Sequence, residues 1–448
     1  MTATPPPGVA PGPAPWTYHQ PWAAQQRKRV LLPILGLVVM AILILVIIGL
    51  AVIGTGPVPV LLATFFAMLP VLPVVGAFLW LDRWEPEPGR MLLTAFLWGA
   101  GVATVSSLIV SLVASVAWSA VVGPEASEVF GTVVTAPVVE EFFKGLLLVL
   151  LLFVKRREFD GVVDGIVYAG LIGIGFAFTE NILYLGNAFA AGGLEGGLQL
   201  FILRCVVSPF AHPLFTSLTG LAVGVASRSS STAAKILLPI LGYLGAVLLH
   251  GLWNGSATFA GGPGFIAVYV AIMVPIFVIM IIVVGLQRRR ERMTVGRHLP
   301  EFVNAGWVAP DEVPLLSTLA GRRGWRAAVK RQSGPVAAQA LKAYQRAVTE
   351  LAFLRDRMAR GAVGADAGPW HDEVVSSLLA ARQQVLQYPK AFVAAWNQPP
   401  PAGWQQPPAV LPPGAPGAQA MPQPPGQPGY YQPTQQSGPG YYQSPPAR

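Results

Sequence analysis

The chain has 448 residues, of which 53% are hydrophobic and only 11% charged, and its net charge is +9 at pH 7. A soluble domain carries about 25% charged residues, so this composition excludes an ordinary soluble protein and indicates a polytopic membrane protein. The single cysteine, Cys205, excludes a disulfide framework within the chain and a cysteine-based metal site. The positive charge does not indicate nucleic acid, because Lys and Arg lie mostly at the ends of apolar runs and after residue 286, where membrane topology and anionic lipid account for them.

The N-terminal segment differs from the rest of the chain. The first 26 residues are rich in Pro and Ala and carry no charged side chain, which predicts a disordered cytoplasmic extension over residues 1–29. Arg27, Lys28 and Arg29 then precede an apolar run. This run is longer than a signal-peptide core of roughly 7–15 residues, so it predicts a retained signal anchor with the N-terminus inside.

Residues 30–286 hold eight apolar runs that are long enough to cross a bilayer, which takes about 20 residues. We therefore expect an all-α polytopic membrane protein with about eight transmembrane helices. The predicted spans are residues 31–53, 57–80, 91–118, 131–154, 164–186, 198–226, 235–256 and 262–286.

The cations in the loops predict the orientation. Almost all loop Lys and Arg lie in residues 82–90, 155–161, 227–235 and 287–293. The loops at about 119–130, 187–197 and 256–262 carry neither residue. Because positive loops stay inside, both termini are predicted to be cytoplasmic.

The fourth span contains two adjacent carboxylates and a cation: Glu140, Glu141 and Lys144. A charge at bilayer depth costs several kcal/mol, so such groups usually face a protein interior and have a function. Glu140 and Lys144 share a helix face, whereas Glu141 lies about 100° away. Lys144 can thus hold one carboxylate ionised while the other differs, as an acid–base pair requires. The structural alternative is a buried Glu–Lys pair that fixes helix packing.

Polar groups recur in the next three spans at Glu180, His212, His250 and Asn254. At 1.5 Å per residue, Glu140 and His212 lie near the midplane, and Glu180 and His250 lie in the outer half. We therefore expect one cavity, open to the outer side, that holds them all. His250 and Asn254 are one turn apart, so both can donate to one oxygen, as oxyanion stabilisation requires.

Each of these groups also has a structural interpretation. Glu180 can reach the headgroups, His212 can belong to a polar packing stripe, and His250 with Asn254 can form an interfacial belt. Pro209 and Pro213 interrupt the helix around His212. Broken helices are tolerated at membrane depth where they line a cavity, which favours the functional interpretation.

The region after the last span is different in character. Residues 287–398 predict a cytoplasmic helical region, with one helix over 336–360 and a second over 369–387. The first helix has a packing face formed by Leu341, Tyr344, Val348, Leu351 and Met358. Residues 399–448 are rich in Pro, Gln and Gly and predict a disordered tail. Cytoplasmic protein partners could bind through residues 293–448.

Residues 57–286 resemble the PrsW-type intramembrane proteases, a branch of the superfamily that includes CAAX-processing and abortive-infection membrane proteases. The matching residues are the loop from Asp82 to Pro88, Glu140-Glu141-x-x-Lys144, Asp164-Gly-Ile-Val-Tyr168, Phe176-x-x-x-Glu180-Asn181, His212 and His250-x-x-x-Asn254. The resemblance implies a protein of the bacterial plasma membrane. It also implies site-1 cleavage of single-span, membrane-anchored anti-sigma factors from the outer side, within a stress-signalling cascade.

The resemblance also implies roles for individual residues. Glu140 or Glu141 would be the base that activates water, and His250 and Asn254 would donate to the oxyanion. Glu180 stands where CAAX enzymes have a histidine, and His212 can compensate for it. The family has also been classed as metallopeptidases, and Glu140, Glu180, His212 and His250 offer zinc ligands. Because the chain lacks His-Glu-x-x-His, we favour a glutamate mechanism without a cofactor and leave zinc open.

Other functions use different signals. A Gly-x-Ser-x-Gly serine site and a Gly-x-Gly-Asp aspartyl site are absent from the spans. A proton-coupled transporter also places Glu, His and Lys at the midplane, but an inverted repeat that would favour it is not evident. A catalytically dead scaffold is a third alternative, disfavoured by the intact carboxylates. The sequence thus predicts an intramembrane endopeptidase whose partners are a single-span membrane protein and the lipid bilayer.

Overall fold

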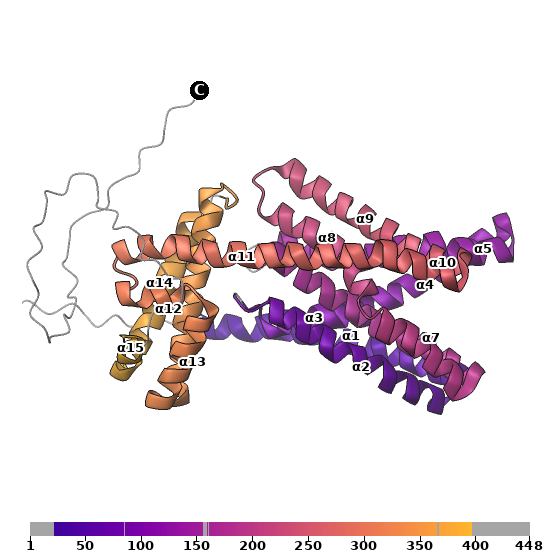
Figure 1. Cartoon of the computed structure of the whole chain (residues 1–448), viewed down its shortest axis with the longest axis horizontal. Helices are drawn as coiled ribbons and strands as arrows, with labels where there is room; N and C mark the ends of the chain where they lie inside the picture. The colour runs from indigo at the N-terminus through magenta and orange to yellow at the C-terminus, as the bar shows by residue number, and fades with distance from the viewer. Residues whose placement is uncertain (1–21, 85, 156–158, 160, 365–366, 397–448) are drawn as a thin grey trace, which may run out of the picture. The chain divides into compact units, whose positions relative to one another are not determined.

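The computed structural model describes residues 22–84, 86–155, 159, 161–364 and 367–396, which all belong to one compact unit. Every regular element in these ranges is a helix (Figure 1), which confirms the predicted all-α class. α1 (Trp22–Thr55) begins within the extension that the sequence predicts to be disordered. Residues 1–21 of that extension and the predicted tail over 399–448 lie outside the described residues.

The described residues from Trp22 to Asn304, here called the membrane part, form eleven α-helices, several of them joined by short π-helical segments. After α1 come α2 (Pro57–Leu81), α3 (Gly89–Leu97), η1 (Trp98–Ala103), α4 (Thr104–Val122), α5 (Pro124–Phe130), η2 (Gly131–Thr135) and α6 (Ala136–Val154). They are followed by α7 (Val162–Phe201), η3 (Ile202–Val207), α8 (Ala211–Ser227), α9 (Thr232–Phe259), α10 (Gly261–Val268), η4 (Tyr269–Met273) and α11 (Val274–Asn304).

Six segments of the described chain are long and apolar enough to cross a membrane. One of them, Val162–Ser227, has 66 residues and contains two predicted spans. It reverses direction at Gly193, whose φ of 59° and ψ of −152° interrupt the helix. α6 is not among the six, and its apolar sequence carries Glu140, Glu141 and Lys144. The number of eight crossings therefore stays a prediction.

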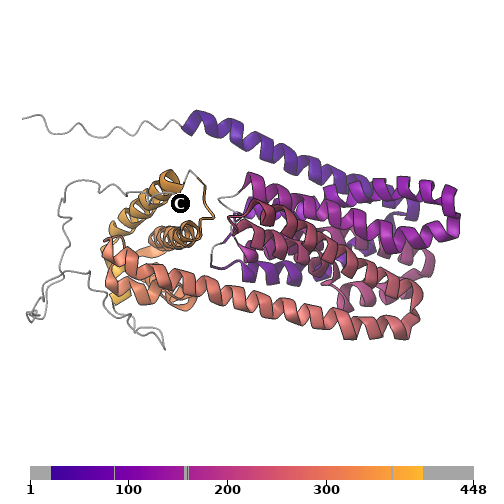
Figure 2. The same ribbon diagram turned by 90° about the horizontal axis from the view of Figure 1, so that it is seen from above.

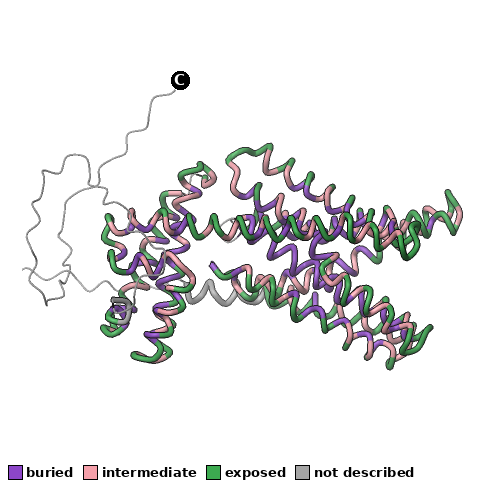
Figure 3. Tube along the Cα trace, in the orientation of Figure 1, coloured by how far each residue is buried: buried purple, intermediate pink, exposed green. Residues whose placement is uncertain are grey.

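α7 is the central helix of the membrane part. Its residues from Val162 to Thr179 are all buried (Figure 3), and it packs chiefly against α2 and α8. Glycines permit this close packing, since a Cβ on Gly165 would lie 2.1 Å from the Gly220 carbonyl oxygen. A Cβ on Gly173 would lie 2.7 Å from the backbone nitrogen of Pro213. Small residues let helix backbones approach closely in a membrane, and here they fix the position of α8.

α11 leaves the membrane part and continues to Asn304, beyond the predicted end of the last span at residue 286 (Figure 2). The following elements are η5 (Pro310–Glu312), α12 (Val313–Leu316), α13 (Leu319–Ala359), α14 (Ala367–Leu386) and α15 (Pro389–Trp396). They form a second hydrophobic core, in which Leu341, Tyr344, Val348 and Leu351 are fully buried. The predicted packing face of this region therefore lies in its core.

The loop after α2 joins this second core. Trp84 is buried in it, with the Arg322 guanidinium 5.0 Å from its ring centroid. Asp82 accepts a hydrogen bond of 2.9 Å from the backbone nitrogen of Glu87. Burial raises the pKa of the Asp82 carboxyl to about 7, because the charged form loses its hydration. An ion pair of 3.3 Å between Arg228 and Asp356 makes a further link.

We expect Gly173→Ala to destabilise the protein, because the added methyl group must push the start of α8 away from α7. Overpacking typically costs about 1–3 kcal/mol, so the melting temperature in detergent should fall. Gly76→Ala is the matched control, since its Cβ would meet no atom within 4 Å. Equal melting temperatures for the two variants would contradict this packing argument.

Candidate active site

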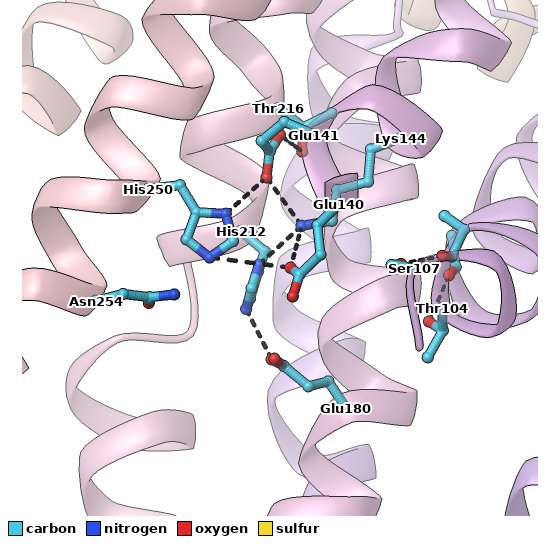
Figure 4. A network of polar contacts seen from close by, with 12 residues as sticks. Thr104, Ser107, Glu140, Glu141, Lys144, Glu180, His212, Thr216, His250 and Asn254 are labelled. Atoms are coloured by element: carbon cyan, nitrogen blue, oxygen red, sulfur yellow. Dashed lines mark hydrogen bonds and ion pairs between the residues drawn. The ribbon is translucent and has the colours of Figure 1, made fainter. Parts of the chain in front are cut away.

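Polar side chains from four helices meet inside the membrane part (Figure 4). α6 contributes Glu140, Glu141 and Lys144, α7 contributes Glu180, α8 contributes His212, and α9 contributes His250 and Asn254. Hydrogen bonds connect the first six of these residues into one network, and Asn254 lies beside it. The residues that the sequence singled out thus lie together, and their catalytic roles stay predictions.

Lys144 is the centre of this network. Its side chain is fully buried, and Nζ lies 2.9 Å from Glu141 Oε1 and 3.2 Å from Glu140 Oε2. Nζ also lies 3.1 Å from His212 Nδ1. An ammonium group has three N–H donors and no acceptor, so these three contacts use all of its donors. The Phe176 ring, 3.8 Å from Nζ, covers the same group.

This arrangement selects a tautomer for His212. Because Lys144 only donates, His212 Nδ1 must accept and the ring proton lies on Nε2. Nε2 is 2.8 Å from Glu180 Oε2, which accepts that proton in a hydrogen bond. His212 is thereby held between a cation and a carboxylate.

The two adjacent glutamates occupy different environments. Glu141 is completely buried, and it accepts from Lys144 and His250 at Oε1 and from Thr216 Oγ1 at Oε2, the last at 3.0 Å. Glu140 lines a cavity, and its Oε2 lies 3.9 Å from His250 Nε2. Glu141 is therefore a buried anchor, whereas Glu140 faces the space in which a substrate would lie.

His250 has a defined orientation as well. Its Nδ1 lies 3.1 Å from Glu141 Oε1, so a neutral ring donates there and leaves Nε2 without a proton. In that state Nε2 accepts, and the predicted donation to an oxyanion requires the protonated ring. Asn254 donates from Nδ2 to the Thr132 carbonyl at 2.9 Å and also lines the cavity.

The cavity has a volume of about 630 Å³. Glu140, Glu180, His212, His250 and Asn254 all line it. Its wall extends to Pro124, Glu128 and Thr258, which lie in or near the loops predicted to be external. Three α4 residues, Ser111, Ser115 and Ser119, add a row of hydroxyl groups. This row was not predicted from the sequence, although its spacing of four residues is a helical signal.

Arg204 is a second residue that was not assigned to the site. It lies on η3, lines the cavity, forms an ion pair with Glu180 through its terminal nitrogen, and donates from Nε to Asn181 Oδ1 at 2.7 Å. Its guanidinium also lies 4.2 Å from the ring centroid of Tyr184. Glu180 is thus held by Arg204 and His212, which does not fit the alternative in which it reaches the headgroups.

A break in the backbone places His212. η3 ends at Val207, residues 208–210 are not helical, and α8 begins at Ala211. This break coincides with Pro209, as the sequence predicts. His212 consequently lies in the first turn of α8, where the helix meets the cavity.

The side chains of Glu140, His212 and His250 are also of the types that bind a metal ion. Their ligand atoms all lie within 4.8 Å of one another. Two histidines and one carboxylate are a three-ligand set that zinc takes in catalytic sites. The contact of His250 Nδ1 with Glu141 is the carboxylate support that metal-bound histidines commonly have. To bind the ion, His212 would have to give up its hydrogen bond to Lys144 or to Glu180, because both of its ring nitrogens have partners.

Comparison with known proteins identifies the family of the chain. A family model described as PrsW family intramembrane metalloprotease matches residues 87–280, which include every predicted site residue. A Geobacillus kaustophilus protein named Protease PrsW is 30% identical over 190 residues, or 41% of this chain and 75% of the relative. The chain belongs to the PrsW family. This family of intramembrane proteases is the one that the sequence motifs resemble.

Other PrsW relatives show how far the similarity extends. Protease PrsW of Clostridioides difficile is 28% identical over 191 residues, or 42% of this chain and 76% of the relative. Protease PrsW of Oceanobacillus iheyensis is 36% identical over 115 residues, which cover 26% of this chain and 48% of the relative. The chain therefore spans about half of that relative and about three quarters of the other two. No solved structure matches the chain.

The contribution of the ion pair between Arg204 and Glu180 to stability can be measured with two single variants and the double variant. We expect Arg204→Gln and Glu180→Gln each to lower the melting temperature, because each leaves one charge without its partner. The double variant should lose less than the two single losses together, since residues in contact are not additive. Arg90→Gln, on an exposed residue, is the control. Strict additivity would show that the pair contributes nothing.

Proposed function

We propose that the protein is an intramembrane endopeptidase of the plasma membrane that hydrolyses a single-span membrane protein in the cavity beside Glu140. The supporting observation is the division between the two glutamates, with Glu141 and Lys144 buried behind Glu140 and Glu140 facing the cavity. Pockets of about 300–1,000 Å³ are typical of ligand sites, and a cavity of about 630 Å³ accepts an extended peptide segment with a water molecule.

Glu140 acts as the base in this proposal. Its carboxylate takes a proton from water while the water oxygen attacks the peptide carbonyl carbon. The ammonium group of Lys144, 3.2 Å away, balances the negative charge of Glu140 before the attack. Glu140 then returns the proton to the leaving amine as the C–N bond breaks. One water is consumed: its hydroxyl group goes to the new carboxyl end, and its proton goes to the new amino end.

The remaining residues position the reactants. Asn254 lies in the same cavity and can offer an amide hydrogen to the oxygen that becomes negative. A protonated His250 would be a second donor. Glu180, held by Arg204, orients His212, which in turn accepts from Lys144. Thr216 and His250 keep Glu141 in place.

The substrate and sidedness follow from the family resemblance. We propose site-1 cleavage of an anti-sigma-factor-like protein from the outer side, with both termini of the enzyme in the cytoplasm. Cytoplasmic partners of residues 293–448 stay a prediction. A proton-coupled transporter could use the same buried charges, but membership of a protease family favours hydrolysis.

A metal-dependent protease is the second candidate. The three donors within 4.8 Å and the description of the family model as a metalloprotease support it. Glu140, His212 and His250 would hold the ion. When bound, zinc would polarise the peptide carbonyl and the attacking water as a Lewis acid.

Glu140→Gln should lower cleavage of a single-span substrate by about 10²–10⁴-fold, the usual contribution of general acid–base catalysis. Its protein level should stay normal, because the amide keeps an acceptor for Lys144. Glu141→Gln should reduce the amount of folded protein, since Lys144 and His250 both depend on that carboxylate. Cleavage by reconstituted protein and immunoblotting measure the two effects. Full activity of Glu140→Gln would exclude it as the base.

Chelation separates the two mechanisms. For the glutamate mechanism we expect the purified, reconstituted enzyme to keep its activity after strong chelation and dialysis. Metal analysis of the same sample, with and without His250→Ala, is the companion measurement. One zinc per chain that is lost in His250→Ala, together with activity that chelation abolishes and zinc restores, would establish the metal-dependent mechanism instead.

A further inference from the structure

A second hollow lies between α2, α8 and α11. It is a groove of about 480 Å³ that shares no lining residue with the active-site cavity. Its wall is almost entirely apolar and includes Phe78, Ile166, Leu214, Phe277 and Met280. The one charged residue in the wall, among those described, is Arg288 at the cytoplasmic end of the predicted last span.

The length of the groove matches one leaflet of a bilayer. On α11 it extends from Phe277 to Arg288. Eleven residues of helix rise by roughly 16 Å, and the hydrocarbon core is about 30 Å thick. The groove therefore runs from the predicted inner surface to about the midplane, which is the depth of a single acyl chain.

Two cations lie beside Trp80 at the predicted cytoplasmic end of the groove: Arg288, which lines the groove, and Arg83, which lies outside its wall. The guanidinium of Arg288 lies 4.0 Å from the ring centroid of Trp80, and that of Arg83 lies 5.6 Å from the same centroid. The buried Nε of Arg288 has no hydrogen-bond partner among the described residues, and Glu291 is the carboxylate close enough to act on Arg288 electrostatically. Arg83 and Arg288 are close enough to repel each other, so an anion that contacts both would be bound favourably.

We infer that this groove binds an anionic phospholipid of the inner leaflet. One acyl chain fills the apolar groove, and the phosphate accepts hydrogen bonds from Arg288 and Arg83. Trp80 lies at the headgroup level, where tryptophan is enriched in membrane proteins. The inference concerns binding alone and does not depend on the proposed protease activity.

The dimensions favour a lipid over a substrate helix. A helix of 20 residues is about 30 Å long and at least 10 Å wide, which gives a cylinder of roughly 2,400 Å³. The groove holds about 480 Å³, so it admits a single hydrocarbon chain and not a helix. Because Phe210 and Pro213 line the groove and flank His212 in the sequence, the bound chain would support the start of α8.

The test uses the full-length protein in detergent, with phosphatidylglycerol or phosphatidylcholine added at equal concentrations. Native mass spectrometry measures the retained lipid, and thermal unfolding measures stabilisation. We expect the wild type to retain phosphatidylglycerol preferentially and to melt at a higher temperature with it. Arg83→Gln combined with Arg288→Gln should reduce this preference by roughly tenfold or more, because charge-assisted hydrogen bonds are lost.

Two further variants make the result specific. Arg289→Gln with Arg290→Gln removes the same charge from exposed positions of α11 and should keep the preference. Gly285→Leu should abolish retention of the lipid while both arginines remain, because a leucine side chain would occupy the open groove. Inorganic phosphate should not reproduce the stabilisation.

Several results would overturn the inference. Equal retention of the two lipids by the wild type would show that the site does not select an anion. An equal loss in the two double variants would assign the effect to general surface charge. Stabilisation by inorganic phosphate alone would indicate a site for free phosphate. If Gly285→Leu abolished substrate cleavage but kept phosphatidylglycerol, the groove would bind the substrate helix instead.

Discussion

The ammonium group of Lys144 holds the membrane-embedded site together, since its three hydrogen bonds reach Glu140, Glu141 and His212. A buried charge is tolerated only when it is paired and hydrogen-bonded. Other features of the site depend on this ammonium group. It sets the tautomer of His212 and helps to keep Glu141 in place. Without it, two adjacent carboxylates could not share one buried helix turn.

The charges of the site do not cancel. Lys144 and Arg204 face three carboxylates, Glu140, Glu141 and Glu180, so with neutral histidines one negative charge is in excess. Glu140 is the one of the two adjacent glutamates that lines the cavity, so it is placed to take up a proton during the proposed reaction. A divalent cation would reverse the sign of the net charge. The same residues therefore suit a group that takes and returns one proton, and the choice between proton and metal reduces to a question of charge.

Much of the site could be predicted from the sequence because its signals are local. Charged residues in apolar runs stand out, and helical spacing places Lys144 on the face of Glu140. The role of Arg204 could not be predicted, because the chain reverses at Gly193 between it and Glu180. Spacing within one helix does not show which residues meet after a reversal. The different environments of Glu140 and Glu141 could not be predicted for the same reason, since they depend on which neighbouring helices cover each face of α6.

In the fold, too, features that depend on neighbouring residues could be predicted, whereas contacts between residues far apart in the sequence could not. Apolar runs predicted where the helices lie, but the participation of Trp84 in the second hydrophobic core depends on residues that follow it by more than two hundred positions. The extent of α11 to Asn304 was not predicted, because a span is defined by its apolar residues, whereas the helix continues through Gly285 into the basic sequence that follows. Hydropathy marks where the apolar sequence ends, whereas the helix ends where its backbone hydrogen bonds do.

The first turn of α8 connects these parts. His212 points to Lys144 and Glu180, whereas Pro213 and Leu214 line the apolar groove next to α11. The break over residues 208–210 leaves this turn without helical continuation on its N-terminal side, so its neighbours must hold it. Gly173 of α7 provides close backbone contact from one direction. A filled groove would provide contact from the other, and the position of His212 in the active site would then depend on both.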